Sequence, residues 1–209
     1  MRIIIFGASG KTGHELVKQA LEHGHHVTAF VRKPSNLKIA NENLTVFQGD
    51  VTNYKLVADA VKGHDAVFSV LGAASPFKYD QSVVDGVSNI VKAMEENGIM
   101  RFIYMSAINV EESRRNAGLL IRIMGTTLLR TETAGHEARE KIIRQSRLDW
   151  TLVRSAALSN GKFTGKYRSG EDIKAKGIAA GISRADVADF LLRQLTDLRY
   201  IRKAPMVMY

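Results

Sequence analysis

The start of the chain constrains its fold more than any other segment. Residues 2–6 form an apolar run with three isoleucines, which is typical of a buried parallel strand. Glycines follow at positions 7, 10 and 13, and a helical pattern with one apolar face begins directly after them. Strand, glycine turn and helix in this order predict the first half of a dinucleotide-binding unit.

The three glycines have different expected roles in such a unit. Gly7 takes the backbone angles of a tight turn, and Gly10 lets the main chain approach a pyrophosphate because no Cβ intervenes. Gly13 allows the helix to pack closely on the strand. The free N–H groups and the positive dipole end of the helix then face the phosphates. The spacing is G-x-x-G-x-x-G, and the alternative interpretation is a turn that needs glycine for its shape and binds nothing.

The rest of the chain alternates between expected strands and helices. We expect strands at residues 27–31, 44–48, 65–71, 101–105 and 148–154, a short extended piece at 162–167, an edge strand at 205–209, and helices at 54–61, 81–96, 133–146 and from Ser183 onward. This order predicts an α/β fold, a Rossmann-like doubly wound parallel sheet with helices on both faces. No repeat or linker divides residues 1–209, so we expect a single domain.

One segment, residues 107–135, interrupts this alternation. Its first part is polar and its second part is apolar, and it is too short to span a membrane. It is a lid over a substrate pocket, the interface of a homodimer or a helix of the core, and a lid is the natural interpretation at this place. Its arginines either meet an anionic substrate or form a solvated face: Arg114, Arg115, Arg122 and Arg130.

The end of the second strand favours one nicotinamide cofactor over the other. An acidic residue there would hold the ribose 2′-hydroxyl of NAD(H). This chain has Arg32 and Lys33 instead, with Ser35 close behind. A guanidinium binds a phosphate through paired hydrogen bonds. The sequence therefore favours NADP(H) over NAD(H), and the alternative is a solvated basic loop.

Two further strands end in residues with ligand-binding chemistry. Asp50 follows the third strand and can accept a hydrogen bond from an adenine amino group, with Val51 against the ring. Asp50 or Thr52 can equally cap the next helix. Ser106 ends the fifth strand, at the sheet edge where ligands bind, and its hydroxyl can hydrogen-bond a substrate carbonyl or a flavin ring. The alternative for Ser106 is the cap of a turn.

Composition excludes several classes of function. The chain has no cysteine, which excludes disulfides, thiolate catalysis and cysteine-ligated zinc and suits a reducing, cytoplasmic location. His23, His25 and His26 lie at a helix end without a carboxylate cluster, so we expect no metal site.

The net charge of +9 suits an anionic cofactor and substrate. It also raises nucleic acid as a partner, which the lack of interleaved aromatic residues and of any recognised motif counts against. We expect no signal peptide, because Met1 leads directly into the first strand.

The ordered set of motifs resembles the atypical short-chain dehydrogenase/reductases of the NmrA-like group, and most closely the biliverdin reductase B or NAD(P)H-flavin reductase type. The strings that carry the resemblance are residues 5–13, Val31-Arg32 with Ser35, Gly49-Asp50-Val51, Leu71-Gly72, Ser106-Ala107 and residues 183–188. They span almost the whole chain in the order of the family.

The resemblance implies a role for each matching residue. It places Gly7, Ser9, Gly10, Thr12 and Gly13 at the pyrophosphate turn, Arg32 and Ser35 at the 2′-phosphate, Asp50 and Val51 at the adenine, Leu71 and Gly72 near the nicotinamide, and Ser106 in the substrate pocket. The implied partner is a small-molecule acceptor, and the oligomeric state is a monomer or a homodimer.

The chain departs from ordinary short-chain dehydrogenases at the catalytic helix. They use a Tyr-x-x-x-Lys pair, whereas this chain has His136 and Glu140, with Lys141 one place late. This counts against alcohol oxidation and sugar-nucleotide epimerisation. His136 is a candidate proton donor, as the flavin-reductase type also has His near this place, or it is a histidine packed under the lid. A second departure is Arg154-Ser155, where the wider group has Arg-Pro.

These features lead to two functional hypotheses. The first is an NADPH-dependent reductase that transfers hydride to a flavin, a quinone or a similar conjugated acceptor, a reaction in which positioning supplies most of the rate. In that case flavin is a substrate. The second is a non-catalytic NADP(H) sensor of the NmrA-like kind, which would use the same cofactor residues.

Overall fold

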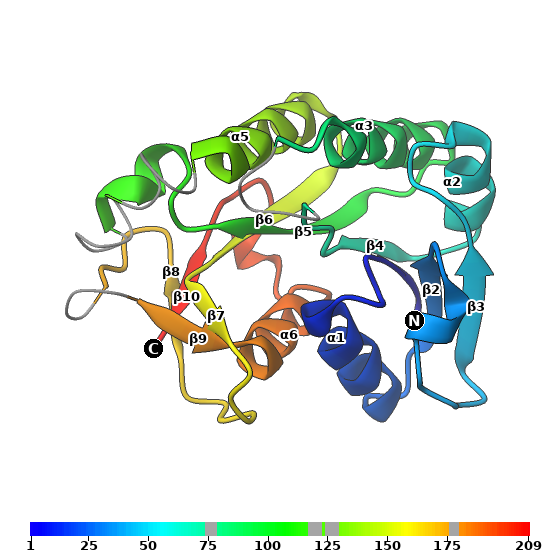
Figure 1. The fold of residues 1–209 in the computed structure, drawn as a ribbon, viewed down its shortest axis with the longest axis horizontal. Helices are drawn as coiled ribbons and strands as arrows, with labels where there is room; N and C mark the ends of the chain where they lie inside the picture. Colours follow the sequence, from blue (N-terminus) through cyan, green and yellow to red (C-terminus); the bar gives the residue numbers. More distant parts are fainter. Residues whose placement is uncertain (74–78, 117–122, 124–129, 176–179) are drawn as a thin grey trace.

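The computed structural model describes residues 1–73, 79–116, 123, 130–175 and 180–209. Its centre is a sheet of eight strands in the order β3-β2-β1-β4-β5-β6-β10-β8 (Figure 1). The strands are β1 (Arg2–Phe6), β2 (His26–Val31), β3 (Leu44–Gln48), β4 (Ala66–Ser69), β5 (Arg101–Ala107), β6 (Asp149–Ser155), β8 (Arg168–Gly170) and β10 (Met206–Met208). All pairs are parallel except β10 with β8. The strand order 3-2-1-4-5-6 confirms the Rossmann-like prediction.

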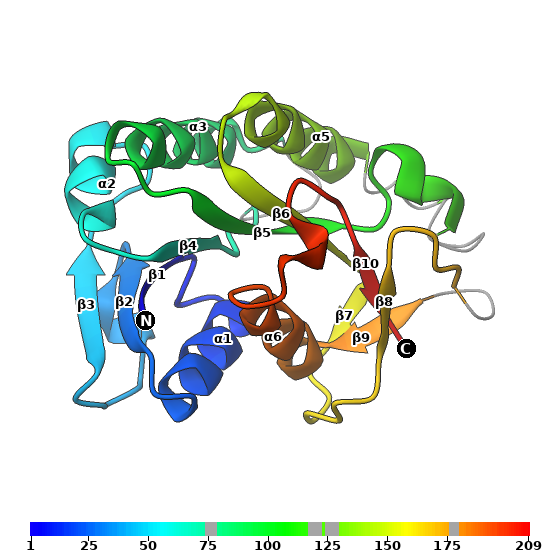
Figure 2. The same ribbon diagram turned by 180° about the vertical axis from the view of Figure 1, so that it is seen from behind.

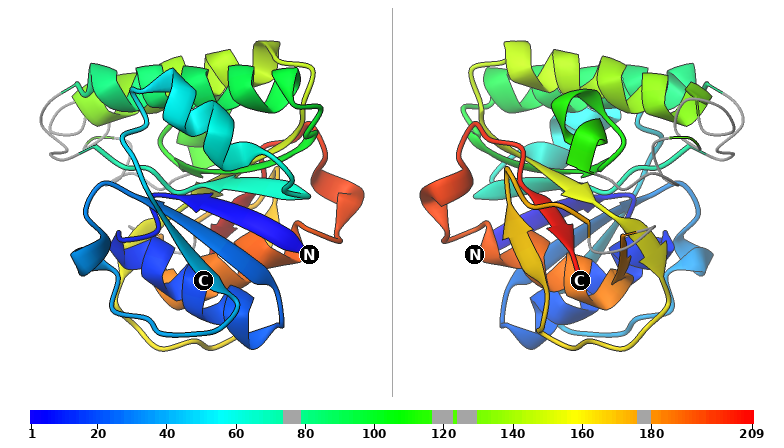
Figure 3. Two further views of the ribbon diagram at one scale, coloured as in Figure 1. Left: turned by 90° about the vertical axis from the view of Figure 1, so that its right-hand side faces the viewer. Right: turned by 90° about the vertical axis from the view of Figure 1, so that its left-hand side faces the viewer.

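Helices cover both faces of this sheet (Figures 1 and 2). The helices α2 (Tyr54–Val61), α3 (Gln81–Glu96) and α5 (Arg130–Gln145) lie on one face, and α1 (Lys11–Glu22) and α6 (Arg184–Arg193) lie on the other. The side views in Figure 3 show the three layers edge-on. Short 3-10 turns are η1 (Pro34–Asn36), η2 (Glu111–Asn116) and η3 (Leu198–Tyr200), and a small parallel sheet joins β7 (Ala157–Ser159) to β9 (Gly181–Ser183). Among the described helices none has the length and apolarity needed to span a bilayer.

The first strand supplies both cores because alternate side chains point to opposite faces. Ile3 and Ile5 pack in the apolar cluster under α1 and α6, whereas Ile4 and Phe6 pack in the cluster under α2 and α3. All four side chains are completely buried. The continuous apolar run of β1 is therefore the pattern of a strand covered on both sides.

Two expectations about the C-terminal part were wrong. The strand at the chain end, β10, lies between β6 and β8, so the antiparallel β8 forms the sheet edge. Residues 162–167 form a loop, and the strand begins only at Arg168. The carboxylate of Asp186 holds this loop by accepting hydrogen bonds from the backbone N–H groups of Thr164 and Gly165, and also from the Tyr209 hydroxyl. Asp186 cannot be inferred as an anchor from spacing alone, because its partners lie about 20 residues away on both sides.

Two helix ends show residues suited to their place. The Ser183 side chain accepts a hydrogen bond from the backbone N–H of Asp186 at the start of α6. Gly24 follows α1 with φ +74°, a left-handed conformation that favours glycine. The interrupted segment is described only in part: β5 continues to Ala107, η2 follows, and α5 begins at Arg130. Arg122 and the apolar stretch around it lie outside the described residues.

The glycine turn shows why the chain needs glycine beside β1. Gly7 has φ +84°, and a Cβ on it would lie 2.9 Å from the backbone of Val70. A Cβ on Gly13 would lie 2.1 Å from the carbonyl oxygen of Gly7, where no atom fits. The first turn of α1 therefore packs directly on the end of β1, as the sequence predicts.

This contact makes the Gly13→Ala variant a test of the packing. We expect it to lower the free energy of unfolding by about 2 kcal/mol, because helix and strand must separate to admit the methyl group. Denaturant unfolding measures the change. Gly72→Ala is the matched control, since a Cβ at Gly72 meets no atom within 4 Å. Equal stability of the Gly13→Ala variant and the wild type would contradict the described packing.

Candidate functional site

A cleft opens at the carboxyl edge of the central strands. Eight of the residues that the sequence singles out line it: Gly7, Ser9, Gly10, Arg32, Asp50, Val51, Leu71 and Gly72. They come from the ends of β1, β2, β3 and β4, which the sheet order brings side by side. This is the place where ligands bind in open α/β sheets.

The first turn of α1 has the features of an anion-binding site. Its N-cap residue, Gly10, has no capping side chain, and the first turn contains no acidic residue. Among the described residues, the backbone N–H groups of Lys11, Thr12 and Gly13 have no hydrogen-bond acceptor. Unpaired N–H groups at a helix N-terminus attract phosphate. Thr12 and Gly13 are themselves buried and are not among the residues that line the cleft.

Arg32 and Asp50 follow the neighbouring strands β2 and β3, and both line this cleft. Arg32 is exposed directly after β2. The pKa of Asp50 is lowered, mainly by hydrogen bonds from the backbone and the hydroxyl of Thr52 and to a smaller degree by the Arg32 charge. One carboxylate oxygen of Asp50, Oδ1, accepts both bonds, at 2.9 and 2.8 Å. Oδ2 therefore remains available to a ligand.

The capping alternative for Asp50 and Thr52 was wrong. The N-cap of α2 is Asn53, whose side chain accepts a hydrogen bond from the backbone N–H of Leu56. Ser35, expected beside Arg32, lies on the exposed turn η1 and does not line the cleft.

The cleft also contains residues that the sequence analysis missed, among them Phe30, Asp80, Ser82 and Val83. The ring of Phe30 lies under Gly49, where a Cβ would come within 2.5 Å of its Cζ atom. Gly49 is therefore needed for the shape of the cleft. The position of Gly49 directly after the third strand is the only sequence feature that points to it. Nothing in the sequence indicates that Gly49 contacts Phe30.

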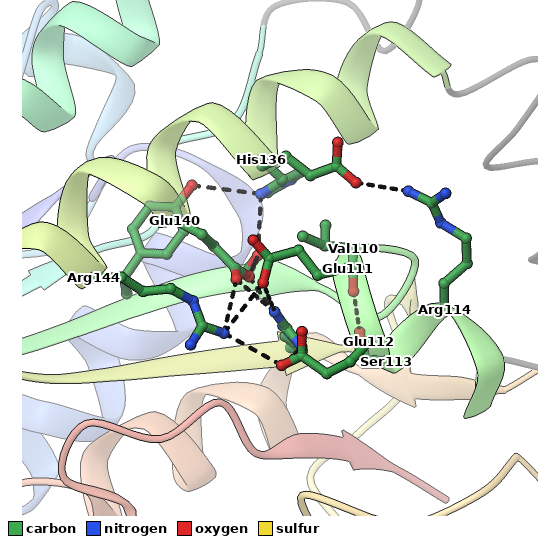
Figure 4. A network of polar contacts seen from close by, with 12 residues as sticks. Val110, Glu111, Glu112, Ser113, Arg114, His136, Glu140 and Arg144 are labelled. Atoms are coloured by element: carbon green, nitrogen blue, oxygen red, sulfur yellow. Dashed lines mark hydrogen bonds and ion pairs between the residues drawn. The ribbon is translucent and has the colours of Figure 1, made fainter.

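A second polar group lies under the ends of β5 and β6 (Figure 4). His136 and Glu140 lie one turn apart on α5, and both face the sheet. The Ser106 hydroxyl donates a hydrogen bond to Glu140 Oε1 at 2.6 Å. His136 Nδ1 lies 3.5 Å from Ser106 Oγ and 3.4 Å from the hydroxyl of Tyr104. The sheet and α5 thus bring the predicted Ser106 and His136 together.

Glu140 is fixed by a buried ion pair that the sequence did not predict. Arg154 Nη2 lies 2.6 Å from Glu140 Oε2, and the two side chains are 1% and 0% exposed. Arg154 also contacts Glu112 at 2.8 Å and Glu111 at 3.3 Å, which ties η2 to the sheet. The carboxylates raise the pKa of Arg154 against the effect of burial. Arg154-Ser155, the departure from the usual Arg-Pro, is therefore part of this ion-pair network.

The network changes the expected chemistry of Ser106. Its single hydroxyl hydrogen is already donated to Glu140, so its oxygen is left as an acceptor. Ser106 in this arrangement cannot donate a hydrogen bond to a substrate carbonyl. Lys141, one position beyond Glu140, is exposed and takes no part.

The surroundings of His136 favour the neutral form of its imidazole. His136 is only 6% exposed. Its pKa lies well below the ordinary 6.5, because burial disfavours the imidazolium and the charge of Arg139 repels it. A neutral imidazole at this place donates or accepts a hydrogen bond, and it holds no excess proton until its surroundings change.

The ion pair predicts strong coupling between Glu140 and Arg154. We expect Glu140→Leu or Arg154→Met alone to lower the free energy of unfolding by about 3 kcal/mol, since each removes the buried partner of the remaining charge. The double variant should be more stable than either single variant. The exposed pair of Lys18 and Glu22 is the control, and Glu22→Ala should change little. Additive losses in the double variant would contradict the coupling.

The pKa of His136 predicts a pH effect on stability. Below pH 6.5 the unfolded chain takes up a proton at His136 that the folded chain does not, so the free energy of unfolding falls as pH falls. The stability of the wild type should decline relative to that of a His136→Gln variant by up to about 1.4 kcal/mol per pH unit in this range. If the free energy of unfolding depends on pH in the same way in both proteins, His136 is protonated equally in the folded and the unfolded chain, and the prediction is wrong.

In the described residues, no group of three or more His, Asp or Glu side chains is arranged so that it could hold a metal ion. His23 and His25 instead contact the Gln19 carbonyl and the chain N-terminus.

Comparisons with known proteins agree with the geometry of the cleft. The family described as NAD(P)H-binding matches residues 7–198. The Bacillus subtilis protein YwnB is 33% identical over 207 residues, which are 93% of this chain and 92% of that protein. The Saccharomyces cerevisiae protein YMR090W is 28% identical, over 93% of this chain and 87% of that protein.

Solved structures share the fold. The oxidoreductase ylbE from Lactococcus lactis superposes with a TM-score of 0.83 at 21% identity, over 99% of this chain and 90% of that one. The anaerobillin reductase ChuY from Escherichia coli O157:H7 gives 0.82 at 21%, over 99% and 96%. A short-chain dehydrogenase/reductase from Veillonella parvula in complex with NADP gives 0.79 at 22%, over 99% and 93%. With its fold, its cleft and the match to residues 7–198, the chain belongs to the family of NAD(P)H-binding proteins.

Proposed function

We propose that the protein is an NADPH-dependent reductase that transfers hydride to a conjugated acceptor such as a flavin or a quinone. The observations that carry the proposal are a cleft that Arg32 lines, the unpaired N–H groups at the start of α1, and a helix α5 that lacks the Tyr-x-x-x-Lys pair. The cofactor, when bound, supplies the hydride. The reductase activity implied by the name of ChuY is consistent with this class of reaction.

The cleft residues have the chemistry to hold NADP(H). The N–H groups at the start of α1 would bind the pyrophosphate, with Ser9 beside them. Arg32 would bind the 2′-phosphate through charge-assisted hydrogen bonds. Asp50 Oδ2 would accept a bond from the adenine amino group. Leu71, at the end of β4, would then lie toward the nicotinamide.

The protein's own contribution to the reaction would be positioning. An electron-poor acceptor needs no strong acid in the protein, because solvent can supply the proton, and orientation contributes most of the rate. The Arg154–Glu140–Ser106 chain would keep the pocket floor rigid, with Ser106 Oγ as an acceptor for the N–H of His136. His136 would hold a proton at Nδ1 for this contact, and its part in proton transfer remains a proposal.

The non-catalytic NADP(H) sensor stays as a second proposal, since one observation favours it. Ser106 and His136 are almost fully buried and contact each other at 3.5 Å, and Ser106 is hydrogen-bonded to Glu140. Neither residue lines the cleft. A sensor would need only the cofactor residues. Turnover of NADPH with any flavin or quinone would exclude this alternative, whereas tight binding without turnover across a broad acceptor panel would favour it.

Arg32 gives the sharpest test of cofactor choice. We expect Arg32→Ala to weaken NADPH binding at least about tenfold and to leave NADH binding nearly unchanged, because only NADPH carries the 2′-phosphate. Calorimetric titration of each cofactor measures both affinities.

The matched control is Arg147→Ala, which removes the same charge from a side chain that is 86% exposed and that lies outside the cleft. This variant should bind both cofactors as the wild type does. Equal losses of NADPH and NADH affinity in Arg32→Ala would count against the 2′-phosphate role.

A further inference from the structure

Arg139 is a buried cation without a carboxylate partner. Its side chain is 2% exposed, and its guanidinium donates only to carbonyl oxygens, from Nε to Gly135 at 2.7 Å and from Nη1 to Leu71 at 3.4 Å. No Asp or Glu forms a salt bridge with it among the described residues. The parts of the chain outside the described ranges contain no Asp or Glu at all. No carboxylate of the described residues therefore forms an ion pair with this guanidinium.

Two other arginines, the buried Arg154 and the partly buried Arg101, show how this chain satisfies a guanidinium. Arg154 is enclosed by three carboxylates. Arg101 has no ion pair but makes four hydrogen bonds, from all three of its nitrogens, to the Gln194 carbonyl, the Asp149 carbonyl and the Thr151 hydroxyl. Arg139 makes two bonds, and its Nη2 has no acceptor among the described residues. A guanidinium has five N–H groups, so most of its binding capacity is unused.

The neighbouring carboxyl of Glu132 does not serve as the missing counter-ion. It lies near enough to feel the Arg139 charge but forms no salt bridge with it. Burial raises the pKa of Glu132 in spite of that charge. A buried charge without a partner is costly, so such groups usually pair with a ligand or an opposite charge.

The guanidinium lies at the ligand edge of the sheet. Its acceptor, the Leu71 carbonyl, belongs to a residue that lines the dinucleotide cleft directly after β4. The side chain bends back along α5 to Gly135, so it lies beside His136 at the same end of the helix. Arg139 is thus placed between the nicotinamide side of the cleft and the Ser106–His136 pair.

We propose that Arg139 binds an anionic group of the acceptor, a carboxylate, sulfonate or phosphate, and that the substrate is therefore a conjugated acceptor with an acidic substituent. This proposal rests on the proposed reductase function and names its substrate class. The net charge of +9 also favours an anionic substrate, because it attracts anions to the protein. The unused N–H groups of a planar guanidinium suit bidentate binding of such a group.

Binding at Arg139 would also act on His136. The Arg139 charge is one of the two causes that lower the pKa of the imidazole. An anion seated on the guanidinium offsets that charge and raises the pKa of His136 again. His136 would then hold a proton more readily when the acidic acceptor is in place than when the pocket is empty.

The test compares naphthoquinone with naphthoquinone sulfonate as acceptors for NADPH. We expect Arg139→Gln to lower kcat/KM for the sulfonate about tenfold or more and to change kcat/KM for naphthoquinone by less than about twofold. Comparing each acceptor between variant and wild type cancels the difference in their intrinsic reactivity. NADPH affinity, measured by calorimetry, should stay unchanged.

Two further variants complete the design. Lys141→Gln removes a charge from an exposed position on the same helix and should leave both acceptors unaffected. Arg139→Lys keeps the charge without the planar fork and should fall between wild type and Arg139→Gln. Equal losses on both acceptors, or weaker NADPH binding in Arg139→Gln, would overturn the proposal, because the guanidinium would then serve the fold or the dinucleotide.

A binding measurement separates this proposal from the reductase function. Naphthalene sulfonate is titrated into the wild-type protein saturated with NADP. We expect binding that weakens with salt and is lost in Arg139→Gln. No binding to the wild type would overturn the anion site even if Arg139→Gln fails to fold. Binding without any turnover of NADPH would leave the anion site standing and remove the reductase.

Discussion

The close contact between β1 and the first turn of α1 is the constraint on which the rest of the structure depends. It exists because Gly7 and Gly13 have no Cβ, and the space for one at Gly13 is filled by the Gly7 carbonyl oxygen. The contact sets the direction of α1, so that its unpaired N–H groups point along the carboxyl edge of the sheet. The strand order then brings Arg32, Asp50 and Leu71 to the same edge. The packing of α1 on β1 therefore shapes this part of the fold and also positions the N–H groups beside the cleft.

A second element of the structure is the buried ion-pair network between α5 and the sheet. The helix α5 carries His136 and Glu140, and Glu140 is bound to Arg154 and Ser106. A carboxylate held between a guanidinium and a hydroxyl is not available as a base. The network instead ties α5, β5, β6 and η2 to one another (Figure 4). This arrangement suits a reaction that depends on orientation more than on acid–base chemistry.

Local patterns were enough to predict the fold and the cleft. The apolar run of β1, the glycine spacing and the helical stripe of α3 depend on neighbouring residues, and the structure has them where the sequence predicts. The position of β10 inside the sheet was not predictable, because it depends on pairing with the distant β8. The Glu140–Arg154 pair and the Phe30–Gly49 contact join separate elements in the same way, and no spacing rule signals them. Arg139 was not singled out, since only the structure shows that it is buried without a counter-ion.

The central claim is that the carboxyl edge of β1–β4 binds a phosphorylated nicotinamide dinucleotide. A crystal structure of the protein grown with NADP tests it most directly. The account predicts the diphosphate at the N–H groups of Lys11, Thr12 and Gly13 and the 2′-phosphate against Arg32. Well-ordered crystals with an empty cleft at saturating NADP, or a dinucleotide bound with its 2′-phosphate away from Arg32, would contradict it.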